Sequence, residues 1–214
     1  MIENDQTIGR VARKRKLARE RLMTAALELI AEHGVEGLRL RELTQRADIG
    51  FGAFYTHFES REQLIEAVVA ETVGALATSI ITNAVEFDDP ALTVAVAHRS
   101  FVGVAYDDPR IAWLIVHLDR ADVLLEHASA AHLQAALERG LRSGRFRGID
   151  ADVTVPFLVG ATVAVMRAIL TGEVEPGADE RSARAFLRTC GLSDQEAAKV
   201  AAQAPPIRSE RAPQ

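Results

Sequence analysis

Residues 39–58 hold the pattern that most constrains the fold, because two short apolar stripes are separated by a tight turn. The first stripe has the spacing i, i+3 and i+7, which predicts a short helix with one buried face. Its members are Leu40, Leu43 and Ala47. Asp48 is a residue type that tolerates the left-handed conformation of a turn, and Ile49 is placed to fill the junction. Phe54 and Phe58 would anchor a second helix. The segment therefore has the form of a helix–turn–helix motif, whose second helix enters the major groove of DNA.

The second helix of this motif would present its outer side to DNA. Its first residues are small, which lets the backbone approach the double helix closely, and they are followed by hydroxyl and imidazole groups that can bond phosphate oxygens. Phe51 has two interpretations, contact with a thymine methyl group or packing inside the protein. The predicted DNA-binding residues are Lys14, Arg39, Arg41, Gly50, Phe51, Gly52, Ala53, Tyr55, Thr56, His57 and Arg61.

Charge is unevenly distributed along the 214 residues, whose net charge is −5. Residues 10–61 carry eleven Lys and Arg against seven Asp and Glu, a balance of +4, so the remainder carries −9. A basic segment on an acidic body fits a local footprint on nucleic acid, although a solvated helix face explains the densest part, residues 10–21, equally well. The single cysteine, Cys190, excludes an intramolecular disulfide, and we expect a cytoplasmic protein without a secretory signal.

Residues that are typical of helix starts and helix ends recur along the rest of the chain, and no segment shows the alternation of a β-strand. Gly34 is placed to end the first helix, and two Asp-Asp-Pro sequences supply an aspartate cap followed by proline, as at helix starts. Ser60 would cap a long helix whose buried side comprises Leu64, Val68, Ala75, Leu76 and Ile80. The apolar stretch 153–172 contains Pro156, Arg167 and three threonines, which favours a buried helix over a membrane span.

The sequence Phe54-Tyr55-Thr56-His57-Phe58, followed by Glu59-Ser60-Arg61-Glu62-Gln63-Leu64, resembles the signature of the TetR family. The resemblance covers residues 17–75 and combines a turn, two anchors, a tyrosine and a basic cap in fixed register. It implies an all-α fold, with an N-terminal three-helix helix–turn–helix DNA-binding domain and a larger helical ligand-binding and dimerisation domain. It also implies a repressor that a small molecule releases from its operator.

Three departures from that family pattern concern DNA contacts. Asp48 stands where the family usually has glycine, Gly50 and Phe51 where it often has serine and lysine, and Leu38 where threonine is usual. Two polar contacts to DNA are thereby lost. Arg39, Arg41 and the basic N-terminal region are candidates to replace the phosphate contacts.

The family resemblance also implies a cavity in the second domain and a homodimer. Side chains predicted to line the cavity are Phe101, Tyr106, Trp113, His117, Leu124 and Met166. Aromatic residues at helical spacing are more often core, and His98 and His117 are left open between interior and ligand-binding roles. Small residues on the apolar helix 153–170 permit close helix approach, so either a dimer or the chain's own core covers this helix. The predicted interface residues are Phe157, Gly160, Ala161, Ala164 and Leu187.

The predicted organisation is a flexible arm (1–9), a DNA-binding domain (10–60), a ligand-binding and dimerisation domain (61–204) and a disordered tail (205–214). Expected partners are a palindromic double-stranded DNA operator, an unidentified small molecule and a second copy of the chain, with no membrane and no cofactor. A helical enzyme or carrier is the competing class. The sequence disfavours it, because no nucleophile with a base, phosphate loop or metal-ligand spacing is evident.

Overall fold

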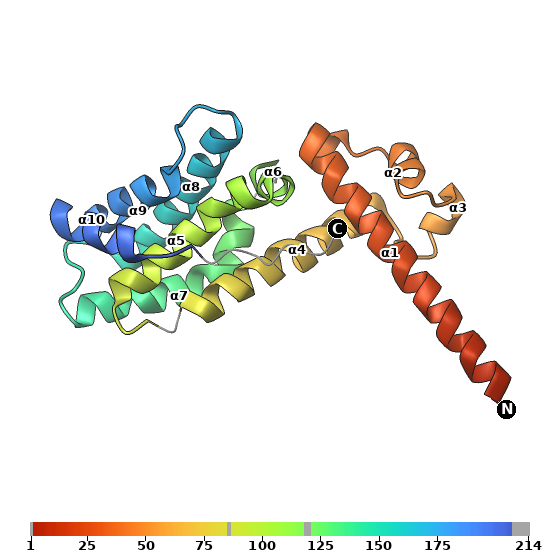
Figure 1. Ribbon diagram of the computed structural model, residues 1–214, viewed down its shortest axis with the longest axis horizontal. Coiled ribbons are helices and arrows are strands. Elements are labelled where there is room, and N and C mark those ends of the chain that lie inside the picture. The colour runs from red at the N-terminus through yellow and green to blue at the C-terminus, as the bar shows by residue number, and fades with distance from the viewer. Residues whose placement is uncertain (1, 85–86, 118–120, 207–214) are drawn as a thin grey trace. The chain divides into compact units, whose positions relative to one another are not determined.

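The computed structural model describes the backbone of residues 2–84, 87–117 and 121–206, and the side chains of 13–84, 87–117 and 131–206. Every regular element in these ranges is an α-helix, which confirms the all-α prediction (Figure 1). The helices are α1 (Ile2–Gly37), α2 (Leu40–Arg46), α3 (Phe51–Phe54), α4 (Arg61–Ala84), α5 (Pro90–Asp107), α6 (Pro109–His117), α7 (Ala121–Arg142), α8 (Ala151–Leu170), α9 (Ala178–Thr189) and α10 (Asp194–Gln203).

The chain divides into two compact units, Met1–Glu71 and Thr72–Gln214. The boundary falls inside α4 rather than between residues 60 and 61, where the sequence analysis placed it. The reason is that the first half of α4 packs with the helix–turn–helix, since Leu64 and Val68 are buried. Residues 207–214 of the predicted tail lie outside the described residues.

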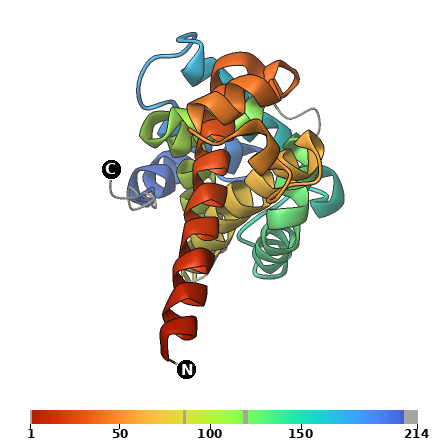
Figure 2. The ribbon, with the colours of Figure 1, turned by 90° about the vertical axis from the view of Figure 1, so that its right-hand side faces the viewer.

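In the first unit, α1 is longer than the sequence analysis expected. It begins at Ile2, so the predicted flexible arm is helical from that residue, because this stretch contains no proline and Gly9 alone does not end the helix. Gly34 does interrupt the helix as predicted, with a φ of 72°. The N-terminal part of α1 extends beyond α2 and α3 (Figure 2).

The helix–turn–helix forms through the left-handed residue that the sequence indicated. Asp48 has a φ of 51°, and the amide of Ile49 donates to the carbonyl of Thr44 over 2.9 Å. The second helix is shorter than predicted, since α3 ends at Phe54 and a turn carries the chain to Phe58. Phe54 and Phe58 are both buried, as expected for anchors.

The second unit is built around α5, which contacts α6, α7, α8, α9 and α10 (Figure 1). Asp89 caps α5 by accepting a hydrogen bond from the amide of Ala91, and Pro90 occupies the first turn. The guanidinium of Arg145 donates to both carboxylate oxygens of Asp89 over 3.1 Å, which connects the turn after α7 to the start of α5.

The predicted buried side of α4 was wrong at one position, because Ala75 lies on the exposed side of this helix.

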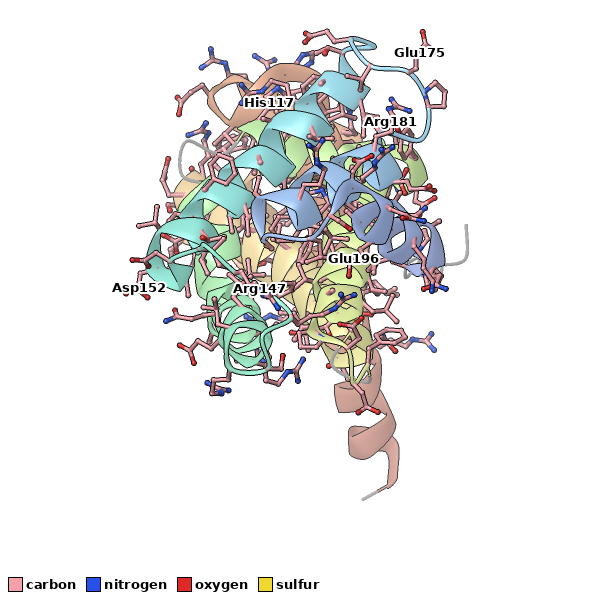
Figure 3. All side chains as sticks on the ribbon, turned by 90° about the vertical axis from the view of Figure 1, so that its left-hand side faces the viewer. His117, Arg147, Asp152, Glu175, Arg181 and Glu196 are labelled. Atoms are coloured by element: carbon pink, nitrogen blue, oxygen red, sulfur yellow. The ribbon has the colours of Figure 1, made fainter. Side chains whose placement is uncertain are left out.

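Ser193 begins α10 with a capping box. Its hydroxyl accepts a hydrogen bond from the amide of Glu196, and the Glu196 carboxylate accepts one from the amide of Ser193. Hydrogen bonds from Ser193 and the charges of Arg145 and Arg147 lower the pKa of the Glu196 carboxyl (Figure 3). This arrangement fixes α10 beside the turn that follows α7.

Within the described residues, α4 and α8 are long and apolar enough to cross a membrane by length and composition alone. A core helix passes the same test. In the second unit α8 contacts α5, α6, α7 and α9. One side of α8 is therefore packed against the core, while Val153 and Phe157 on its other side are exposed.

Gly140 is a position where the packing permits no side chain. A Cβ atom there would lie 2.0 Å from the Phe146 ring, which is fully buried. We therefore expect Gly140→Ala to lower the free energy of unfolding by about 1–3 kcal/mol in urea titrations, because the ring must shift. Gly74→Ala is the matched control, since among the described residues a Cβ atom there would meet nothing within 4 Å beyond its own helix backbone. It should raise stability by up to about 1 kcal/mol through helix propensity. Equal effects of the two changes would contradict this assignment.

Candidate DNA-binding and ligand sites

The outer surface of α3 and its following turn is formed by residues that the sequence analysis assigned to DNA binding. Gly50, Gly52, Ala53 and Thr56 are exposed, and a Cβ atom built at either glycine meets no described neighbour within 4 Å. This surface is therefore open to close approach by another molecule. Lys14 on α1, and Arg39 and Arg41 at the start of α2, are exposed as well.

Four aromatic rings connect this surface to the core of the first unit. Phe51 meets the ring of Tyr55 edge to face at 5.9 Å, and Tyr55 meets Phe54 at 5.2 Å. Phe54 in turn lies 5.9 Å from Phe58, over which the guanidinium of Arg19 sits at 5.2 Å. Phe51 and Tyr55 are 52% and 53% exposed. Phe51 thus packs on one side against Tyr55 and is exposed on the other, and its contact with a thymine methyl group stays a prediction.

Two arginines of α1 hold the motif, and the sequence analysis did not single them out. Arg15 donates to the carbonyl of Thr56 over 3.1 Å, just after α3. Arg19 forms a two-point ion pair with Glu71 of α4, with distances of 3.0 and 2.6 Å. The available signal was their i, i+4 spacing, which places both on one face of α1.

His57 and Arg61 differ from the other predicted DNA contacts, because both are partly buried. Burial, followed by the charges of Arg15 and Arg19, lowers the pKa of the His57 imidazole, which favours the neutral ring. Arg61, 24% exposed, donates to the carbonyls of Leu38 and Val35 and pairs with Glu62. Its guanidinium therefore stabilises the loop before α2, which does not favour the predicted phosphate contact.

The second unit contains a cavity of about 80 Å³ between α4, α5, α7, α8 and α9. Its walls are mainly apolar. The lining residues are Ile81, Ala84, Thr93, Val94, Ala97, His98, Phe101, His132, Leu133, Ala136, Leu158, Val159, Thr162 and Phe186. The volume lies well below the roughly 300–1,000 Å³ of pockets for drug-sized molecules, so the cavity favours a compact ligand.

His98 is a buried polar residue of the cavity wall, together with Thr93 and Thr162. Its Nε2 lies 2.8 Å from the Ser182 hydroxyl and its Nδ1 lies 3.2 Å from the Thr162 hydroxyl. Burial lowers the pKa of the imidazole to about 4, against the opposing charge of Asp179. The ring is therefore neutral near pH 7, with one N–H to donate and one nitrogen to accept. The interior interpretation of His98 holds, and the residue lines the cavity as well.

A second polar group lies at the Thr93 side of the cavity. The Thr93 hydroxyl accepts a hydrogen bond from Nη2 of Arg139 over 3.4 Å. Nε of Arg139 is buried and, among the described residues, has no hydrogen-bond partner. An oxygen acceptor bound beside Thr93 would satisfy such a donor.

Of the residues predicted to line the cavity, Phe101 does so and four others do not. The Tyr106 hydroxyl instead accepts from the amide of Ala178 at the start of α9. Trp113 stacks on His117 at 4.8 Å, and Met166 is buried away from the cavity lining. These four side chains therefore lie outside the lining of this cavity, because their sequence spacing indicates which face of a helix packs but not where a void remains. The side chain of Leu124 lies outside the described residues.

The predicted dimer residues separate into two groups. Phe157, Gly160 and Ala164 are exposed, and Ala161 is half-buried, so this side of α8 is uncovered within the described chain. Val153 and Phe157 are 66% and 60% exposed, although both are large apolar side chains. Leu187, by contrast, is fully buried in the core of its own unit, because its face of α9 is directed inward. It is therefore not available to a partner, and that assignment was wrong.

A short helix–turn–helix with an exposed second helix, followed by a helical unit with a mainly apolar cavity, defines a class of one-component, ligand-responsive DNA-binding regulators. Within the described residues, no group of His, Cys, Asp or Glu is arranged to hold a metal ion. Residues 22–68 match the family model for bacterial regulatory proteins of the tetR family, and residues 89–203 match the tetracyclin repressor-like C-terminal domain. The chain belongs to the TetR family of transcriptional regulators.

Several bacterial regulators and solved structures resemble the chain. The transcriptional repressor AcnR of Corynebacterium glutamicum is 26% identical over 62% of this chain and 66% of its own length. An HTH-type transcriptional regulator of Mycobacterium tuberculosis is 25% identical, covering 82% of this chain and 84% of the relative. The crystal structure of RolR with its ligand resorcinol has a TM-score of 0.72 and 30% identity, covering 92% of this chain and all of RolR (100%). FadR of Bacillus subtilis with stearoyl-CoA, at 16% identity and a TM-score of 0.68 over 81% of this chain and 99% of FadR, shares the fold.

Arg61→Ala separates a structural role from a DNA contact. Because the guanidinium bonds two carbonyls, its loss should lower the free energy of unfolding by about 1.5–3 kcal/mol. The slope of log DNA affinity against log salt should not change. Arg39→Ala is the matched control, an exposed arginine whose loss should leave stability unchanged and reduce the slope by about one unit. A reduced salt slope with unchanged stability for Arg61→Ala would contradict this assignment. Urea unfolding and gel shifts at several salt concentrations provide both measurements.

Proposed function

We propose that this protein is a repressor that leaves its operator when a compact small molecule occupies the cavity around His98. The observation that carries the proposal is the cavity of about 80 Å³, whose lining includes Ile81 and Ala84 from the same helix, α4, that begins at Arg61 after the helix–turn–helix. A ligand that displaces this end of α4 would also move its other end, because α4 is one continuous helix. The expected setting is the cytoplasm, where the operator is.

The chemistry of the cavity supports a small, largely apolar ligand that carries a hydroxyl or another oxygen acceptor. Phe101 and Phe186 supply apolar walls, while neutral His98 and the Thr93–Arg139 pair supply polar contacts. The RolR structure contains resorcinol, a single ring with two hydroxyl groups. Small phenols are therefore the first probes to test with this chain.

The test combines ligand-induced stabilisation with DNA release. A ligand that binds only the folded protein raises the melting temperature, so we expect a shift with resorcinol or a related phenol and release of operator DNA by the same compound. Ala97→Leu fills part of the cavity and should abolish both effects while operator binding remains. Ala75→Leu makes the same change on the exposed side of α4 and should behave as wild type. Operator release from Ala97→Leu at wild-type ligand concentrations would contradict the assignment of the site.

The proposed active form is a homodimer that binds a palindromic operator, with α8 in the interface. The support is the exposed stripe of Val153, Phe157, Gly160 and Ala164, which recurs with helical spacing on one side of α8. Small residues in this stripe allow a second helix to approach closely. A two-fold dimer would present two recognition helices to two half-sites.

Gly160→Glu tests the dimer, because a charge buried without a partner is costly. We expect sedimentation to show a dimer for the wild type and a folded monomer for this variant, with operator affinity strongly reduced. Ala75→Glu adds the same charge at another exposed helical position and should remain a dimer. Wild-type protein that sediments as a monomer at micromolar concentration would refute the proposal.

A further inference from the structure

The short helix α3 offers almost no hydrogen-bonding side chain for reading base edges. Its residues Phe51–Phe54 comprise two phenylalanines, a glycine and an alanine, and Phe54 is buried. In the turn that follows, the Thr56 hydroxyl donates to the carbonyl of Ala53 over 2.7 Å, so its proton is already used. Phe51 and Tyr55 are the large exposed side chains of this surface, and only Tyr55 carries a polar group.

Phe51 is held in a defined position although it is exposed. Its ring lies edge to face against Tyr55 with an interplanar angle of 73°, and Tyr55 meets the buried Phe54 at 87°. Gly50 and Gly52, on either side in sequence, add no side chain that would shield it. A rigid apolar ring is thus presented at the start of α3, between backbone positions that permit close approach.

Only one base of DNA offers an apolar partner to such a ring in the major groove. Thymine carries a C5-methyl group, whereas the other bases present polar donor and acceptor atoms beside plain C–H edges. A polar base edge covered by a phenyl ring would lose its water without gaining a hydrogen bond. A thymine methyl group placed against the ring gives up no hydrogen bond to water, and the contact removes apolar surface from water.

We propose that Phe51 reads the C5-methyl group of a thymine in the major groove, so that α3 selects its site by methyl contact. The proposal rests on the proposed function, in which α3 enters that groove. The ring contact with Tyr55 positions Phe51, and the expected consequence is an operator that requires thymine at one position of each half-site.

Replacement of thymine by uracil is the direct test, because it removes the methyl group and leaves base pairing intact. With the full-length protein and a duplex selected from random sequences, each thymine is replaced in turn and affinity is measured. We expect one position per half-site to weaken binding about fourfold, the value for exposing one buried methyl-sized group. Replacement in both half-sites should weaken binding about fifteenfold, since the two losses add in free energy.

Phe51→Ala decides whether this ring is responsible. The variant lacks the ring at both half-sites, so its affinity for the thymine duplex should fall about fifteenfold, as in the double replacement. Its affinity should no longer depend on the methyl group at that position. Leu17→Ala removes another exposed apolar side chain, 52% exposed on α1, and should keep the methyl dependence. Phe51→Leu should retain part of it, and thermal melting confirms that each variant is folded.

The outcomes separate the two proposals. Absence of binding to any selected duplex would overturn the proposed function together with this inference. Binding with no thymine position sensitive to uracil, or with equal sensitivity in wild type and Phe51→Ala, would overturn the methyl contact alone.

Discussion

The continuity of α4 is the constraint on which the proposed function depends. Leu64 and Val68 in its first half are buried in the unit that holds the helix–turn–helix, while Ile81 and Ala84 near its end line the cavity. A helix is stiff because each backbone amide bonds the carbonyl four residues earlier. The same element therefore belongs to the DNA-binding unit and to the wall of the ligand site, which is the arrangement that two-site coupling requires.

The proposed DNA-binding surface is supported by aromatic rings and by two arginines of α1. Arg19 connects α1 to Glu71 and to the face of Phe58, and Arg15 holds the turn after α3. Phe51 and Tyr55 are exposed above this support. Positive charge is carried by α1 and the start of α2, so in the proposed complex these residues bind phosphate while α3 makes the base contacts.

Local chemistry made much of the fold predictable from sequence. The left-handed turn at Asp48, the break at Gly34 and the Asp-Pro start of α5 depend on single residues and their neighbours, and each is present in the structure. The cavity was predicted less well, because a void depends on how five helices meet. Phe101 lines the cavity as predicted, whereas Trp113 and Met166 do not. Leu187 is buried in the core, because the side of α9 that packs inward also depends on how the helices meet. The roles of Arg15 and Arg19 require contacts across 41 and 52 residues, which no local pattern reveals.

Coupling between the cavity and the DNA-binding surface is measurable, because linkage relates the two binding affinities. If ligand favours the arrangement that does not bind DNA, operator DNA must weaken ligand binding by the same factor by which ligand weakens operator binding. The decisive measurement is calorimetric titration of the ligand into the protein with and without saturating operator. We predict a loss of ligand affinity of about 5–150-fold in the presence of operator. Equal affinities in the two titrations would contradict it, even if both molecules bind tightly.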